Sequence, residues 1–271
     1  MWLQRVHTLA ANRRRDDPDL ELDAALAQFA APEHHSWRPF QLAFILMNLP
    51  ALADPTHPER TAGDGLVDLL FFPTGGGKTE AYLGLTAFTL AIRRLQGTVA
   101  GHDGRSGGVA VLMRYTLRLL TAQQFQRAAA LMCACEHLRR ELLAQGDDRW
   151  GETPFRLGMW VGSSVTPNTN IDAGYALEDA RGQGRRGGSR ASPLQLVSCP
   201  WCGRRLDAGR DAKTDTDRWR TLVFCSDPFG ACPFTQAGSP GEGIPVVTVD
   251  DELYRLLPAF VISTADKFAQ L

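Results

Sequence analysis

The sequence has no long apolar run, no excess of either charge and only three lysines. Its longest apolar stretch, residues 42–53, is interrupted by Asn48 and Pro50 and is shorter than the roughly 18 residues that cross a bilayer. The amino-terminal residues include no apolar core and no small-residue cleavage site, so we expect them not to act as a secretory signal. We therefore expect a cytoplasmic protein, in which cysteines serve as metal ligands or core residues rather than as disulfides.

The composition is that of an ordinary globular protein. A hydrophobic share of 44% and a charged share of 22% exclude a disordered chain, a collagen-like repeat and a coiled coil. The length of 271 residues allows one large or two modest domains. Only three of the 29 basic residues are lysines, and each is therefore examined for a specific role: Lys78, Lys213 and Lys267.

Short apolar runs alternate with helical segments through most of the chain. Buried strands are predicted at residues 66–72, 109–113, 155–161, 245–249 and 259–263. Helices are predicted at residues 20–31, 40–49, 78–95, 117–144 and 251–256. This alternation predicts an α/β fold, a doubly wound parallel sheet with helices on both faces.

The α/β pattern is interrupted in the second half of the chain. Residues 162–198 are rich in Gly, Ser, Asn and Arg, which is typical of an exposed, mobile insertion. Pairs of cysteines follow before the pattern resumes. We expect an N-terminal helical extension (1–37), a P-loop core (38–161), a flexible Gly/Arg-rich insertion (162–198), a zinc ribbon (199–236) and a continuation of the core (237–271).

A phosphate-binding loop is predicted between the strand at 66–72 and the helix at 78–95. Residues 73–79 read Pro-Thr-Gly-Gly-Gly-Lys-Thr, and the glycines let successive backbone N–H groups surround a phosphate at the helix N-terminus. Lys78 would reach the β- and γ-phosphates of ATP, and the Thr79 hydroxyl would complete a Mg²⁺ shell. Lys78 and Thr79 are thus the candidate catalytic residues. The further candidate contacts are Thr74, Gly75, Gly76, Gly77 and Glu80.

One residue departs from the general P-loop pattern. That pattern has glycine six positions before the lysine, where this chain has Phe72. The alternative is a glycine-rich turn followed by a chance Lys-Thr. The order of strand, loop and helix favours the nucleotide site.

Four of the six cysteines form two pairs that predict a metal site. Two residues separate Cys199 from Cys202, so both thiolates can reach one ion, and six residues separate Cys225 from Cys232. Four thiolates predict a structural Zn²⁺ ribbon with no open coordination position, the alternative being free thiols in an apolar loop. Cys133 and Cys135 fall within an apolar helix and are interpreted as core residues.

With these motifs in place, residues from about 38 to 271 resemble the first RecA-like domain of a superfamily 2 helicase. The resemblance is closer to the helicase subunit of the DISARM phage-defence system. Residues 73–79 match the P-loop of that superfamily, and residues 38–41, Arg-Pro-Phe-Gln, resemble its Q motif. The Q motif implies that Gln41 recognises adenine; without it, Gln41 is a polar residue at the start of a helix.

Two further elements resemble those that contact the nucleic-acid backbone in this superfamily. Residues 111–124 resemble motif Ia, and residues 262–267 resemble a later strand and loop. The implied partner is DNA, single-stranded or duplex with a single-stranded end, and other defence-system subunits are further candidates. The arginines, the hydroxyls and the free N–H groups at a helix start could all contact phosphates. The alternative is that these residues form a solvated edge of the helix. The candidate contacts are Arg114, Thr116, Arg118, Thr121, Thr264 and Lys267.

Residues 246–252 form an apolar run with an acidic end, which is the pattern expected of a Walker B strand. In the helicase order, however, the Ser-Thr-Ala-Asp-Lys element precedes the metal-binding Asp-Glu, whereas here it follows. We therefore expect a fragment that ends before Walker B and before the arginine finger, which alone contributes about 10³ to 10⁵ in rate. The expected function is that of the ATP-binding lobe of an ATP-dependent DNA helicase or translocase in antiviral defence, which binds ATP but hydrolyses it slowly.

Two other functions each fit part of the sequence. A non-catalytic zinc-ribbon module that binds nucleic acid or a partner fits the ten basic and four acidic residues of segment 181–220. A small-molecule P-loop kinase fits the length, but it explains neither the motif Ia stretch nor the cysteines.

Overall fold

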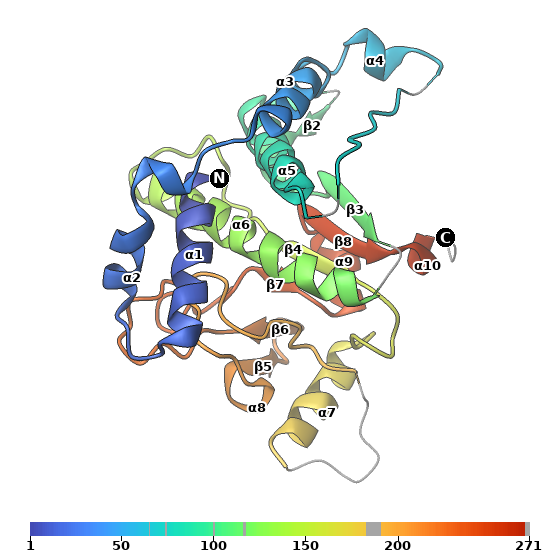
Figure 1. Ribbon diagram of the computed structural model, residues 1–271. Coiled ribbons are helices and arrows are strands. Elements are labelled where there is room, and N and C mark those ends of the chain that lie inside the picture. The colour runs from blue at the N-terminus through green and yellow to red at the C-terminus, as the bar shows by residue number, and fades with distance from the viewer. Residues whose placement is uncertain (65, 74, 100, 116–117, 183–190, 269–271) are drawn as a thin grey trace.

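The fold is centred on a four-stranded parallel sheet, seen in a computed structural model (Figure 1). The structure describes residues 1–271 apart from 65, 74, 100, 116–117, 183–190 and 269–271, and only the backbone of 118–122 and 268. The sheet order is β3 (Val111–Tyr115), β8 (Phe260–Thr264), β4 (Leu157–Trp160) and β7 (Val246–Val247), and each neighbouring pair is parallel. The predicted α/β class is confirmed, and four of the predicted strands are present.

Helices cover both faces of this sheet. The main hydrophobic core joins strand residues such as Leu157 and Ile262 to α5 (Lys78–Leu95) and α6 (Arg118–Ala144). On the opposite face, Leu253 of α9 (Asp250–Leu256) packs with strand residues Val247 and Val261. These helices match the predicted segments at 78–95, 117–144 and 251–256 to within a residue at each end.

Several helices precede the sheet. In Figure 1, α1 (Trp2–Asp16) lies beside α6, α2 (Leu22–Phe29) packs on α1, and α3 (Pro39–Ala53) lies along α5. Short helices η1 (Pro32–His34) and α4 (Pro58–Thr61) follow α2 and α3 respectively. The sequence predicted α2 and α3 but not α1, because α1 has few apolar side chains and ends in three arginines.

The strand predicted at residues 66–72 is not formed. No described strand pairs with this segment, and four of its apolar side chains are more than half exposed: Leu66, Val67, Leu69 and Phe71. An apolar run becomes a buried strand only when a neighbouring strand satisfies its backbone and other layers cover its faces. The sequence reveals the apolar run but not whether such neighbours are present.

The region after β4 is more ordered than its composition indicates. It contains α7 (Asn170–Ala180), α8 (Ala208–Asp211), β5 (Ala212–Asp215) and β6 (Arg220–Val223), with β5 and β6 antiparallel. Helix α7 lies within the predicted mobile insertion and begins with a capping box in which Thr169 and Asp172 bond each other's backbone N–H. Residues 183–190 lie outside the described part. The cysteine region shares the main hydrophobic core with the sheet.

The remaining elements are β1 (Thr98–Val99), β2 (His102–Asp103), η2 (Gly104–Ser106) and α10 (Ala265–Phe268). Among the helices of the described residues, none combines the length and apolarity that crossing a bilayer requires.

Candidate functional site

The glycine loop lies at the N-terminus of the 18-residue helix α5. Gly75 and Gly77 adopt left-handed φ values of 79° and 94°, which residues with a β-carbon rarely adopt. Gly77 caps the helix, so the unpaired N–H groups and the positive dipole end of α5 lie next to the loop. This geometry is suited to an anion such as a phosphate.

Gln41 contacts this loop directly. Its Oε1 accepts a hydrogen bond from the backbone N–H of Arg38 at 2.9 Å, and its Nε2 donates to the Gly77 carbonyl at 2.8 Å. A β-carbon at Gly77 would lie 2.8 Å from Gln41 Nε2, so glycine is also required for this approach. The Arg38 guanidinium adds a hydrogen bond to the Gly76 carbonyl at 2.8 Å. Segment 38–41 and the loop therefore form one unit.

Lys78 points back over the beginning of the loop. Its Nζ donates to the backbone carbonyls of Phe72 and Pro73, the second at 3.1 Å. The Phe72 ring stacks on Phe40 with centroids 3.8 Å apart, and a β-carbon at Gly76 would lie 3.1 Å from that ring. Phe72 thus fits where the P-loop pattern has glycine, because Phe40 takes up its ring and Gly76 leaves room for it.

A cleft of about 830 Å³ opens in front of these residues. Its lining brings together six of the eight predicted nucleotide contacts: Gln41, Gly75, Gly77, Lys78, Thr79 and Glu80. The predicted contact Thr74 lies outside the described residues. Arg127 of α6 also lines the cleft and is ion-paired with Glu80. Sequence reasoning missed Arg127, because one arginine on a long helix gives no signal of the surface it faces.

The predicted nucleic-acid contacts are distributed over two neighbouring strands. The β3–β8 register pairs Arg114 with Ser263 and Tyr115 with Thr264, so the carboxyl ends of both strands meet. Arg114 is exposed, whereas Thr264 is buried. Lys267 forms an ion pair with Asp250 at 2.7 Å. Thr116 and the side chains of Arg118 and Thr121 lie outside the described part of the chain.

The four predicted metal ligands, Cys199, Cys202, Cys225 and Cys232, form one buried cluster. Their sulfur atoms all lie within 4.8 Å of one another. The Cys199–Cys232 and Cys202–Cys225 sulfur distances are 3.8 and 3.4 Å. Four sulfurs bound tetrahedrally at about 2.3 Å from one ion would be about 3.8 Å apart. The described cluster therefore has close to the size and the donor set of a four-thiolate metal site.

The electrostatics of this cluster favour a bound cation. Burial raises the pKa of the Cys199 thiol well above its usual value, whereas hydrogen bonds from Cys199 and the other sulfurs lower the pKa of the Cys202 thiol. The buried cluster thus accommodates some negative charge, but four thiolates without a cation would repel one another. A divalent ion would remove that repulsion, so these residues could hold a metal such as zinc.

Helix α1 is fixed to the first cysteine pair. Its His7 ring stacks on Trp201 with centroids 3.5 Å apart, and His7 Nδ1 lies 2.9 Å from the Trp201 carbonyl oxygen. The buried Arg14 guanidinium donates to the Cys202 carbonyl at 2.7 Å. A β-carbon at Gly203 would lie 2.4 Å from the Ala11 carbonyl oxygen, so the approach of α1 requires glycine there. The helical extension and the cysteine centre therefore depend on each other.

Glu252, the last residue of the acidic run 250–252, has a structural role. The fully buried Glu252 accepts hydrogen bonds from Arg220 Nε at 2.9 Å and from the Thr221 backbone N–H at 2.5 Å. Arg220 also pairs with Glu242, which pairs with Arg156 at 2.6 Å. A carboxylate engaged in this way is not free to hold Mg²⁺, in agreement with the rejection of Walker B at this run.

Comparison with known proteins gives one direct relationship. No family model matches the chain. The chain is 40% identical over 276 aligned residues to the DISARM protein DrmA of Bacillus paralicheniformis. The alignment covers 98% of this chain and 22% of that protein, so the chain spans about a fifth of the length of its curated relative. Over nearly its whole length, this chain is therefore related in sequence to a part of a DISARM protein.

Proposed function

We propose that this chain is the ATP-binding lobe of an ATP-dependent DNA helicase or translocase with a RecA-like core, acting in DISARM-type phage defence. The observation that carries the proposal is the glycine loop at the start of α5, held against Gln41 beside a cleft of about 830 Å³. Relatedness to a DISARM protein supports the biological setting.

Each part of the cleft has a role in this proposal. The loop N–H groups and the helix dipole would bind the phosphates, and Lys78 would exchange the Phe72 and Pro73 carbonyls for phosphate oxygens. The Thr79 hydroxyl would complete the shell of Mg²⁺, and Gln41 would meet the adenine. Arg127, now paired with Glu80, is a second cation within reach of the cleft.

The proposed DNA surface begins at the carboxyl end of β3. Arg114 is exposed there, and the neighbouring strand β8 ends beside it at Thr264. Contacts of this kind bind the phosphate backbone and carry no sequence preference. The cysteine centre, which we propose holds Zn²⁺, keeps α1 and the insert attached to the core without taking part in the chemistry.

Hydrolysis by this chain alone is expected to be slow. Phosphoryl transfer requires a carboxylate that orders the metal and water and a cation over the transferred group. Among the described acidic residues that could supply the carboxylate, Glu252 is engaged by Arg220 and Asp250 by Lys267. We therefore propose nucleotide binding as the activity to measure first.

Replacement of Lys78 by alanine is expected to weaken Mg-ATP binding by roughly 10- to 150-fold, because hydrogen bonds to charged groups contribute about 1.5–3 kcal/mol. Isothermal titration calorimetry of the purified chain measures this directly. Lys213→Ala is the matched control, because Lys213 lies over the Phe224 ring outside the cleft and its loss should leave ATP binding unchanged. Equal affinity in wild type and Lys78→Ala would rule out the nucleotide site.

A further inference from the structure

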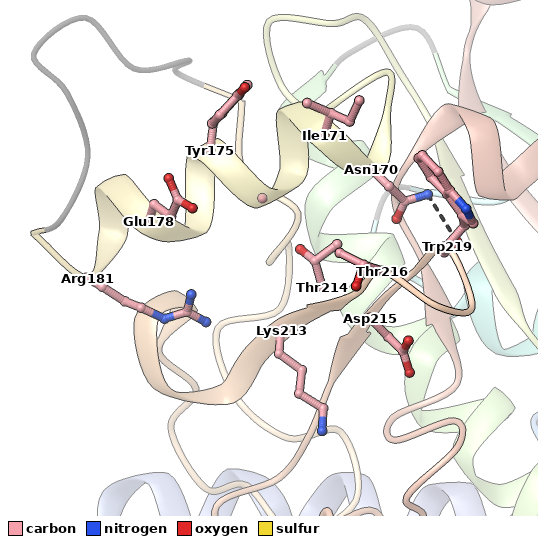
Figure 2. A pocket seen from close by; sticks show the side chains of 11 residues that line it. Asn170, Ile171, Tyr175, Glu178, Arg181, Lys213, Thr214, Asp215, Thr216 and Trp219 are labelled. Carbon is pink, nitrogen blue, oxygen red and sulfur yellow. Dashed lines mark hydrogen bonds between the residues drawn. The ribbon is translucent and has the colours of Figure 1, made fainter.

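A second hollow, of about 380 Å³, lies between α7 and the β5–β6 hairpin, far in sequence from the glycine loop. Figure 2 shows Tyr175 on α7 along one side and Thr214 on β5 along the other, with Trp219 at one end and Arg181 at the opposite end. Neither the ATP cleft nor the cysteine centre includes these residues. The hollow therefore requires an explanation of its own.

Gly174 keeps the hollow open. It lies in the middle of α7, where glycine costs about 1 kcal/mol relative to alanine. A β-carbon there would meet only the Thr214 hydroxyl oxygen, at an ordinary contact distance of 3.8 Å. That hydroxyl is itself buried and has no hydrogen-bond partner among the described residues. The hollow therefore has space beside Gly174, while the Thr214 hydroxyl lies beneath its accessible surface.

Trp219 is held at the rim in a strained conformation. Its φ is +52°, a region that large side chains rarely adopt and that recurs at binding sites. Asn170 Nδ2 donates to the Trp219 carbonyl at 3.1 Å, and Arg255 donates to the same oxygen. Trp219 remains 57% exposed, and Tyr175, which also lines the hollow, remains 62% exposed. The fold therefore fixes the tryptophan backbone while leaving its ring free to contact a ligand.

We propose that this hollow binds an unpaired base of a single-stranded nucleic acid, stacked on the Trp219 indole. An exposed indole and a phenol provide the flat apolar surfaces on which bases stack. The base must be unpaired, because neighbouring bases cover both faces of a base within a duplex.

The charges around the hollow are compatible with a phosphate backbone beside it. Arg181 donates to the carbonyls of Gly209 and Ala212, both at 2.8 Å, which fixes a positive charge at one end. Asp215 accepts the backbone N–H groups of Asp217 and Arg218 at 3.1 and 3.0 Å, so its carboxylate is occupied by its own turn. Segment 181–220, which supplies six of the lining residues, carries ten basic and four acidic side chains. The lining itself is balanced, with Arg181 and Lys213 against Glu178 and Asp215, so attraction of a phosphate backbone would come from basic residues of segment 181–220 outside the hollow.

This inference goes beyond the proposed function and does not depend on it. The proposed DNA surface at Arg114 contacts only backbone phosphates, whereas this hollow would hold a base. ATP binding through Lys78 shares neither residues nor a readout with it. The two proposals can therefore fail separately.

Replacement of Trp219 by glycine is expected to weaken binding of fluorescein-labelled oligothymidylate by roughly 5- to 150-fold in fluorescence anisotropy. Glycine adopts the positive φ at this position without strain, so the unfolding midpoint should stay equal or rise while affinity falls. If Trp219 only supported the fold, its replacement would lower the unfolding midpoint together with the affinity. Gly174→Leu, which fills the hollow from α7, should weaken binding to a similar degree.

Phe229→Ala is the matched control, because Phe229 is an exposed aromatic residue of the same insert outside the hollow. It should bind the oligonucleotide as the wild type does. Photocrosslinking with 5-iododeoxyuridine should attach the strand at Trp219 or Tyr175. If both Trp219→Gly and Gly174→Leu bound the oligonucleotide with wild-type affinity, the proposal would be overturned. A protein segment would then be the remaining candidate occupant of the hollow. Crosslinks confined to the Arg114 side, or no binding by the wild type, would overturn the proposal as well.

Discussion

Removal of metal from the cysteine centre is expected to abolish the cooperative unfolding transition of this chain at ordinary temperature. Structural zinc contributes an apparent free energy of about 10–16 kcal/mol in zinc-finger peptides. That range is as large as the whole stability of a typical domain, about 5–15 kcal/mol. The four cysteines share the main hydrophobic core with the sheet, and α1 is attached to them through Trp201 and Cys202. Loss of the ion should therefore affect far more than the insert.

The measurement combines metal content with thermal unfolding. Elemental analysis of the wild type should give about one zinc per chain. A strong chelator should then lower the helical circular dichroism signal and expose the core to a hydrophobic dye. Cys202→Ala should lose the metal, whereas Cys135→Ala should retain it, because Cys135 is a buried core cysteine outside the cluster. A metal-free wild type with an unchanged unfolding midpoint would contradict the assignment.

Replacement of Arg220 by methionine is expected to destabilise the fold by about 3–5 kcal/mol. The change leaves Glu252 without its guanidinium partner in a site where that side chain is almost fully buried. Burial already raises the pKa of Glu252, while the charge of Arg220 opposes that rise. At Glu242, burial is outweighed by hydrogen bonds from Arg156 and by the Arg220 charge, so its pKa is lowered. Without Arg220, both carboxylates become more costly to keep ionised.

Thermal unfolding at several pH values tests this prediction. The lowered pKa of Glu242 means that its stabilising contribution is present above the usual glutamate value, near pH 4.5, and is lost as the pH falls below it. The difference between wild type and Arg220→Met should therefore be largest near pH 7 and should shrink toward pH 4. Arg218→Met is the control, because Arg218 is largely exposed and lies 4.0 Å from Asp215. That exposed pair should contribute about 1 kcal/mol or less. If Arg220→Met and Arg218→Met had similar unfolding midpoints at pH 7, the prediction that Arg220 stabilises the fold through Glu242 and Glu252 would be refuted.

Sequence patterns were most reliable where local chemistry decides the outcome. The helix from Lys78 to Leu95 matches its prediction because Gly77 and Gly97, both with positive φ, flank it. The cysteine spacing correctly predicted a four-sulfur cluster, although the second pair is wide, since a loop of six residues still returns Cys232 to Cys225. The predictions failed where packing between segments decides the structure. In α1, for example, the three arginines indicate an exposed polar segment, although Arg14 is buried against the cysteine centre.

Segment 66–72 and helix α7 are failures of opposite kinds. The first has the composition of a buried strand and is exposed, because a strand needs neighbours that its own residues cannot supply. The second lies in a segment whose overall composition is that of a loop, but residues 170–180 themselves include three alanines, a leucine and a glutamate, which favour a helix, and a capping box and packing against β5 stabilise it. Both outcomes depend on contacts between segments that are distant along the chain.

By itself, the sequence determined the α/β class, the glycine loop before α5 and the four-cysteine cluster, because each is specified by residue types at short, fixed spacings. The Q-motif resemblance already predicts Gln41 at this site, whereas only the tertiary structure decided that Arg127 lines the same cleft and that α1 depends on the cysteine centre. The tertiary structure also formed the hollow beside Trp219, from residues on two elements more than 30 positions apart. The physical reason is that long-range packing sets which side chains face each other, and no local spacing encodes it.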